Sequence, residues 1–265
     1  SEIVNSDGVL LTTEGRYNTE SGFGELFSRS KAVMNRGTTL IGDTLIYDRE
    51  LGYGEAFGNM ELEDTAKKSI LTGDYGFYDQ LRDSAFVTGR ALAMEYSSGD
   101  TLYLHGDTIR AFKVFLDEIQ INDSTFVVAD TTNHIVAYPR VRFYRTDMQG
   151  LCDSMTFVSL DSTLYLNHHP IVWSENRQIV GNEIYVHFND STVDSATLPN
   201  QALVAEEIEE GFYNQLKGRE MIAYFDNGVM RHLDVIGNVQ AVSFPMENDS
   251  TYNKVVTMES STLSA

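Results

Sequence analysis

Residues 42–48 read Gly-Asp-Thr-Leu-Ile-Tyr-Asp, and residues 73–79 read Gly-Asp-Tyr-Gly-Phe-Tyr-Asp. A weaker copy, Gly-Asp-Thr-Ile, begins at Gly106, so the three starts lie 31 and 33 residues apart. A second type of strand-like segment, which contains a glycine, occupies residues 56–62, 87–93 and 235–241. Units of two short strands cannot bury an apolar face alone, so a repeat of this length indicates a stacked array.

The rest of the chain also has the pattern of β-strands. Runs rich in Val, Ile, Thr, Tyr and Phe are separated by Gly, Asn, Asp and Ser at intervals of roughly 8–12 residues. Helical periodicity is nearly absent, and the best helical candidate, residues 202–216, fits a strand and a loop equally well. We therefore expect an all-β fold, built as one continuous array over residues 1–265. A sub-division near residue 150 is the alternative.

Composition narrows the function classes. The chain has 39 acidic and 19 basic residues, a formal charge of -20, which repels phosphate backbones and makes nucleic acid an unsuitable partner. An anionic lipid would have to be held mainly by its apolar chains. Apolar residues make up 42% of the chain, enough to bury a core, yet no apolar run is long enough to span a bilayer as a helix.

Alternation assigns the apolar side chains to faces, because residues two apart in a strand share a face. In both strand types the apolar positions fall on a common face, which we expect to lie between two sheets. The predicted inward-facing residues are Leu45, Tyr47, Met60, Leu62, Met155, Ile184, Val186, Met221 and Val239.

Two interpretations of this interior fit the sequence. In the first it is a filled sandwich core, and Gly58, Gly89 and Gly237 mark bulges. In the second the glycines leave room for an apolar ligand, with methionine and alanine as an adaptable lining. Both interpretations need the same alternation, so periodicity does not choose between them.

The sequence lacks the motifs of common catalytic and metal sites. It contains no Gly-x-Ser-x-Gly, phosphate loop, Cys-x-x-Cys or His-Glu-x-x-His. The pair His168-His169, near Asp161, is a candidate metal site by residue type. Adjacent residues of a strand point to opposite faces, however, so we expect the pair to lie in a surface turn. We expect no enzymatic activity, no cofactor and no metal.

Several segments together resemble the OstA-like family, which contains the lipopolysaccharide-transport proteins LptA and the N-terminal domain of LptD. The similarity extends from about Leu10 to about Val256. The later segments resemble the Bacteroidetes-type OstA-like proteins in particular. The segments that carry the resemblance are residues 42–48, 58–62, 147–153, 170–173, 214–218 and 237–240.

The resemblance implies a twisted, V-shaped β-jellyroll that is open along one side. Such a protein carries the acyl chains of lipopolysaccharide or lipid A between its sheets, in the periplasm, after removal of a signal peptide. The nine inward-facing residues would then form the lipid-binding groove. Expected partners are other transport components, or further copies of the chain, stacked end to end through edge strands.

Two features depart from the family pattern: the charge of -20 does not suit a phosphorylated ligand, and the chain is long for a simple bridge. It could be the periplasmic part of a larger protein. Two other hypotheses remain. A closed β-solenoid for surface assembly needs a filled core, and a carbohydrate-active enzyme on a β-helix needs paired carboxylates in a cleft.

Overall fold

The structure is a computed structural model of the chain. It describes residues 2–5, 8–34, 37–97, 99–122, 125–189, 192–227, 229–246, 252 and 254–265, with backbone alone for residues 5, 117–122 and 125–130. The described residues contain β-strands and no α-helix, and the predicted all-β jellyroll is confirmed. No described helix is long and apolar enough to cross a membrane. The chain divides into two compact units, Ser1–Arg145 and Thr146–Ala265.

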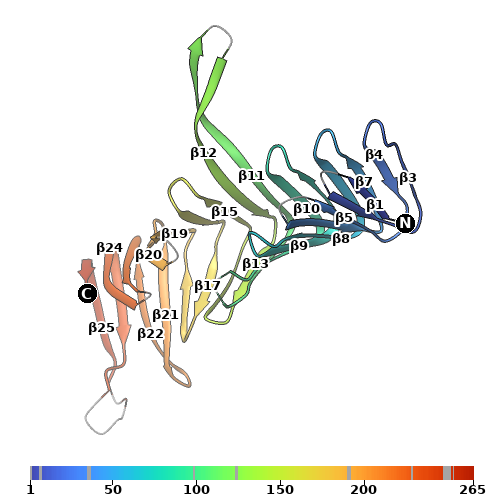
Figure 1. The fold of residues 1–265 in the computed structure, drawn as a ribbon. Coiled ribbons are helices and arrows are strands. Elements are labelled where there is room, and N and C mark those ends of the chain that lie inside the picture. Colours follow the sequence, from blue (N-terminus) through green and yellow to red (C-terminus); the bar gives the residue numbers. More distant parts are fainter. Residues whose placement is uncertain are drawn as a thin grey trace. The chain divides into compact units, whose positions relative to one another are not determined.

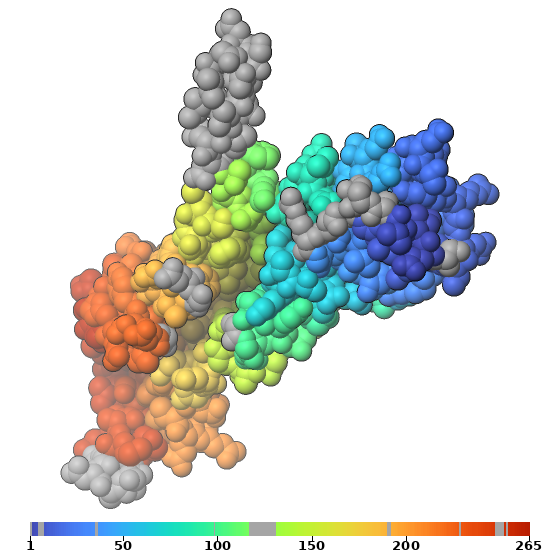
Figure 2. Space-filling view, in the orientation of Figure 1, coloured from blue at the N-terminus to red at the C-terminus, as the bar shows by residue number. Residues whose placement is uncertain are grey.

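Unit 1 is a series of antiparallel strands that follow one another in sequence order, from blue to green in Figures 1 and 2. Its strands are β1 (Glu2–Asn5), β2 (Gly8–Leu11), β3 (Gly15–Tyr17), β4 (Phe23–Leu26), β5 (Ser30–Met34), β6 (Thr38–Gly42), β7 (Thr44–Asp48), β8 (Tyr53–Asp64), β9 (Ser69–Asp79), β10 (Ser84–Glu95), β11 (Leu102–Asn122), β12 (Thr125–Tyr138) and β13 (Val141–Arg145).

Long strands connect the two sheets of unit 1. The first half of β8 pairs with β7, and its second half pairs with β6. We call the sheet that contains β3, β4, β7 and β12 sheet A, and the sheet that contains β1, β2, β5, β6 and β13 sheet B. Strands β8 to β11 belong to both. Each turns from one sheet into the other along its length, so the sheets meet along a common corner.

Bulges form this corner. The register of β8 shifts between Phe57 and Met60, and that of β10 shifts after Thr88. At the shift in β8, Gly58 and Asn59 have φ of 71° and 45°, a left-handed conformation that glycine adopts without steric cost. Gly89 has the same conformation, with φ of 72°. The glycines of the second strand type therefore mark bulges, as the first interpretation of the sequence holds.

Unit 2 has the same construction, coloured from yellow to red (Figures 1 and 2). Its strands are β14 (Met148–Cys152), β15 (Ser154–Val158), β16 (Thr163–Asn167), β17 (Ile171–Ser174), β18 (Arg177–Val180), β19 (Glu183–Asn189), β20 (Thr192–Leu198), β21 (Ala202–Glu209), β22 (Phe212–Gly218), β23 (Glu220–Asp226), β24 (Val229–Ser243) and β25 (Val256–Ser264). The segment with helical potential, residues 202–216, forms β21 and most of β22.

In unit 2, β15, β16, β19, β20 and β23 form sheet C, and β14, β17, β18, β21 and β22 form sheet D. Strand β24 pairs with β23 in sheet C and with β22 in sheet D, and its register shifts between Ile236 and Val239. His168 and His169 lie at the same corner, exposed and with φ of 63° and 57°. The pair forms a surface turn.

Candidate functional site: the interior between the sheets

The structure buries eight of the nine residues predicted to face inward. In unit 1 these are Leu45, Tyr47, Met60 and Leu62, and in unit 2 they are Met155, Ile184, Met221 and Val239; Met155 is the most exposed of them, at 7%. Val186 is half-buried. Burial places these side chains in the interior, while their role in lipid binding stays a prediction.

Two parallel rows of apolar side chains cross the inner face of sheet C. The inner row lies next to the corner and is buried; it consists of Met155, Leu166, Ile184, Leu198, Met221 and Val235. The outer row lies two residues further from the corner and is half-buried; it consists of Phe157, Leu164, Val186, Ala196, Ala223 and Leu233. Burial thus decreases with distance from the corner.

The outer row presents a continuous apolar strip that the protein itself covers only in part. Leu164 is the strand partner of Val186, which in turn is the partner of Ala196, so the strip runs across the strands without a polar interruption. Such a strip can accept an unbranched apolar chain along its length. Alternation in the sequence predicts that Val186 faces inward, and the strand register shows which residues lie beside it in the row.

Unit 1 has a different interior. The outer row of sheet A begins with Gly24, Tyr47, Gly54 and Tyr78, all buried, and continues through half-buried alanines to Ile135, which is 39% exposed. A side-chain carbon added to Gly54 would lie 2.9 Å from Leu40 Cδ2, a residue of sheet B. The sheets therefore pack directly on each other at β8, and the apolar row becomes more accessible toward β12.

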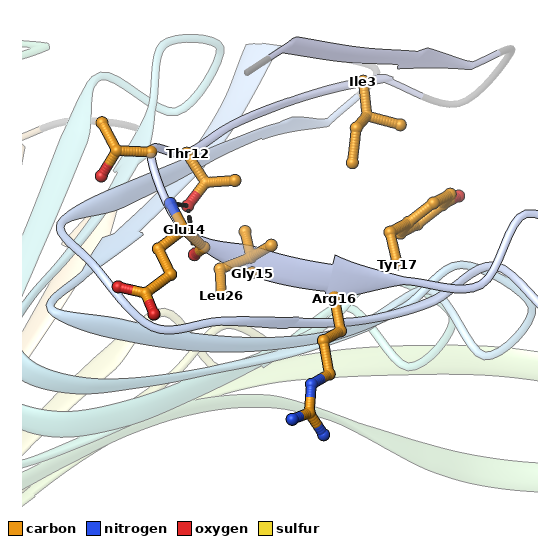
Figure 3. A pocket seen from close by; sticks show the side chains of 8 residues that line it. Ile3, Thr12, Glu14, Gly15, Arg16, Tyr17 and Leu26 are labelled. Carbon is orange, nitrogen blue, oxygen red and sulfur yellow. Dashed lines mark hydrogen bonds between the residues drawn. The ribbon is translucent and has the colours of Figure 1, made fainter.

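A cavity of about 430 Å³ opens at the N-terminal end of unit 1. Its volume is within the range of small-molecule sites, roughly 300–1,000 Å³. Ile3, Tyr17 and Leu26 point into the space, whereas Glu14 and Arg16 point away from it (Figure 3). The interior of unit 1 is thus unfilled at its first strands, where Thr12, Thr13 and backbone groups line the cavity beside the three apolar side chains.

The remaining candidates for a site are metal-ligating groups, buried polar atoms and the single cysteine. They contain no group of three or more His, Cys, Asp or Glu side chains arranged for a metal ion. Among them, no buried side-chain nitrogen or oxygen lacks a hydrogen-bond partner. Burial, and then the nearby Asp153, raise the pKa of Cys152 to about 12, so this thiol stays protonated and weakly nucleophilic at neutral pH.

Comparison with solved structures gives several matches. No protein-family model and no curated protein matches the chain. The chain is similar to the crystal structure of LptH, described as the LptA-homologous periplasmic component of the lipopolysaccharide transport device of Pseudomonas aeruginosa. The two are 14% identical, the similarity covers 45% of this chain and 74% of that chain, and the TM-score is 0.33.

Proposed function

We propose that the chain binds lipid acyl chains between its sheets and carries lipopolysaccharide through the periplasm toward the outer membrane. The half-buried outer row of sheet C, from Phe157 to Leu233, supports this function most directly. Its side chains are apolar and face inward, yet they keep part of their surface free for a further apolar group. The resemblance to the OstA-like family indicates that the lipid is lipopolysaccharide.

The charge of the protein sets how such a ligand is held. At a formal charge of -20, long-range electrostatics oppose an anionic lipid. Apolar burial must supply the affinity, at about 0.8 kcal/mol for each methylene removed from water. An acyl chain that covers the outer row gains this energy without any contact to its head group, which is free to remain in water.

The terminal strands support assembly with partners. Strand β25 pairs with β24 along both sheets, and no other described strand pairs with its far edge. In unit 1, β1 pairs only with β2 and β3 only with β4 among the described strands. Free backbone donors and acceptors at such edges can pair with another transport component or with a second copy of the chain.

Site-specific photo-crosslinking to lipopolysaccharide in cells tests the proposal. A photoreactive residue at Val186 or Leu164 should give a lipopolysaccharide adduct, because both side chains lie in the outer row. The control position is Tyr185, which neighbours Val186 on β19 but points to the opposite face. Adducts at Tyr185 and none at Val186 or Leu164 would contradict lipid transport between the sheets.

One observation favours the alternative, a closed β-solenoid for surface assembly. Leu40 packs directly against Gly54, so the two sheets of unit 1 are in contact at β8. If the whole chain were such a solenoid, photoreactive residues throughout the interior, including Val186, would crosslink only to the protein itself. The same experiment therefore separates the two functions.

A further inference from the structure

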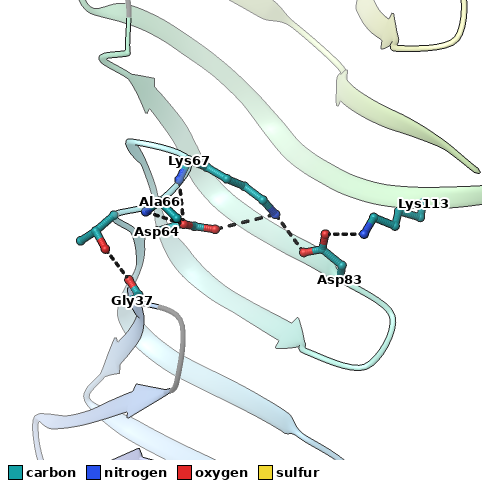
Figure 4. A network of polar contacts seen from close by, with 7 residues as sticks. Gly37, Asp64, Ala66, Lys67, Asp83 and Lys113 are labelled. Carbon is teal, nitrogen blue, oxygen red and sulfur yellow. Dashed lines mark hydrogen bonds and ion pairs between the residues drawn. The ribbon is translucent and has the colours of Figure 1, made fainter.

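Four charged side chains meet at the free ends of the two sheets of unit 1 (Figure 4). The Lys67 ammonium lies 2.8 Å from one carboxylate oxygen of Asp83, and the Lys113 ammonium lies 2.9 Å from the other. Asp64 lies on the opposite side of Lys67, with 3.7 Å between Nζ and Oδ2. Two lysines and two aspartates thus form a compact network with no formal net charge.

This network spans from one sheet to the other. Asp64 ends the sheet B half of β8, and Lys67 follows it in the turn to β9. Asp83 lies in the next turn, between β9 and β10, at the free end of sheet A. Strand β9 runs through the corner from one free end to the other, so the Lys67–Asp83 pair connects the two sides of the opening opposite the corner. We call this opening the mouth of unit 1.

Hydrogen bonds in the turn between β8 and β9 fix the backbone of Lys67 near Asp83. The backbone amides of Ala66 and Lys67 donate to Asp64 Oδ1 over 3.0 and 2.9 Å, which fixes the turn that carries the lysine. Asp83 receives two cations, one from each side. Tyr47, Leu62 and Tyr78 are buried behind the mouth. An apolar chain that approaches from the side therefore meets an ion pair before it reaches the interior.

Both partners of the pair favour their charged forms. Burial lowers the pKa of Lys67, but the hydrogen bond and charge of Asp83 outweigh it and bring the pKa above its ordinary value. Burial likewise raises the pKa of Asp83, but the two lysines outweigh it and bring the pKa below its ordinary value. The pair is therefore ionised at neutral pH.

We propose that the Lys67–Asp83 ion pair is a latch that keeps the mouth of unit 1 closed, and that an amphiphile with an anionic head group opens it. This inference rests on the proposed function, since it assigns the lateral entry point for an acyl chain. The head group competes with Asp83 for Lys67 and Lys113, because a phosphate or carboxylate offers the same charge-assisted hydrogen bonds. The apolar chain then enters between the separated sheets.

Distance measurement across the mouth tests the latch without any lipid. Spin labels are attached to A66C and L81C, at exposed positions in the two turns, and their separation is measured by pulsed electron paramagnetic resonance. The labelled protein with the Lys67–Asp83 pair intact should give one narrow distance distribution. Lys67→Met should lengthen and broaden it, whereas Lys67→Arg should leave it narrow. Because Lys67 is 59% exposed, high salt should act in the same direction as Lys67→Met.

Arg90→Met is the matched control, because it removes an exposed Arg–Asp pair of the same unit, with Asp74, that does not cross the mouth. The distribution in this variant should equal that of the unsubstituted protein. A distribution in Lys67→Met that is also unchanged would overturn the latch, since the mouth would then stay closed without the ion pair.

Three probes test the opening step on the same labelled protein: dodecyl phosphate, dodecanol and inorganic phosphate. Dodecyl phosphate should lengthen the distance by several ångströms, whereas dodecanol lacks the charge and inorganic phosphate lacks the chain, so neither should change it. An equal response to dodecanol would overturn the role of the head group. Failure of the latch and failure of lipid transport remain distinguishable, because crosslinking at Val186 in unit 2 reports on transport alone.

Discussion

Ile184 and Val186 lie two residues apart on β19 and share the inner face of sheet C, yet they belong to different rows. Ile184 is 3% exposed in the inner row, and Val186 is half-buried in the outer row. Truncation of a fully buried isoleucine to alanine costs about 2–5 kcal/mol in free energy of unfolding, because a cavity remains. Full burial of a valine contributes about 1.5–3 kcal/mol, so a half-buried valine that loses two methyl groups should cost only about 1 kcal/mol.

Urea unfolding, followed by the fluorescence of Trp173, measures both variants. Trp173 is the sole tryptophan and lies on β17 of the same unit. We expect Ile184→Ala to lower the free energy of unfolding about threefold more than Val186→Ala. Val186→Asp should still unfold cooperatively but bind lipopolysaccharide at least tenfold more weakly, because its charge lies where the acyl chain lies.

Two results would refute this reasoning. If Val186→Ala costs as much as Ile184→Ala, the outer row is packed core and has no surface free for a lipid. If Val186→Asp folds and binds lipopolysaccharide as tightly as the unsubstituted protein, the ligand does not contact the outer row.

Other predictions address the corner, the core and the ligand. In urea unfolding, Gly89→Ala should destabilise the protein by about 2–3 kcal/mol and Gly211→Ala by about 1 kcal/mol. Both glycines have a left-handed backbone conformation. Only at Gly89 would the added carbon meet a neighbour, the Asp74 carboxylate, at 2.6 Å. Equal losses would show that the corner is not tightly packed. Met60→Asp should abolish cooperative unfolding, because the carboxylate would be buried without a partner; a cooperative transition near that of the unsubstituted protein would contradict the assigned burial. At pH 8, iodoacetamide should alkylate Cys152 at least a hundredfold more slowly in the folded protein than in urea. This difference in alkylation rate should become smaller as the pH rises toward 12, because the thiol of the folded protein then ionises. The affinity for lipopolysaccharide, measured by calorimetry, should stay constant or rise slightly between low and moderate salt, because salt screens the repulsion between two anions; a steep loss would indicate a phosphate-gripping site.

The repeat and the two-residue alternation were enough to predict the fold class and most of the interior. Leu45 and Met60 lie in the two strand types, on the apolar face of each strand, and this face is the one that becomes buried. The corner glycines, by contrast, fitted both a bulge and an open slot. Only the φ values and the register shifts identify Gly58 and Gly89 as bulges, because the same residue type serves either purpose.

Sequence alternation could not predict the difference between Ile184 and Val186. Both positions are apolar and share a face, and what separates them is their distance from the corner. That distance depends on where each strand turns into the other sheet. At His168 and His169 the turn is made by non-glycine residues in left-handed backbone, which sequence patterns do not mark as a corner.

No sequence pattern predicts the ion pair at the mouth of unit 1. Lys67 and Asp83 are charged residues in turns, and isolated charges in turns are ordinary surface features. Their meeting depends on the corner in β9, which folds two distant turns toward each other. This placement also bears on the formal charge of -20, which opposes an anionic head group at long range. At the mouth, two lysines balance two aspartates. An anionic amphiphile therefore finds two cations there that can exchange one carboxylate for another anion.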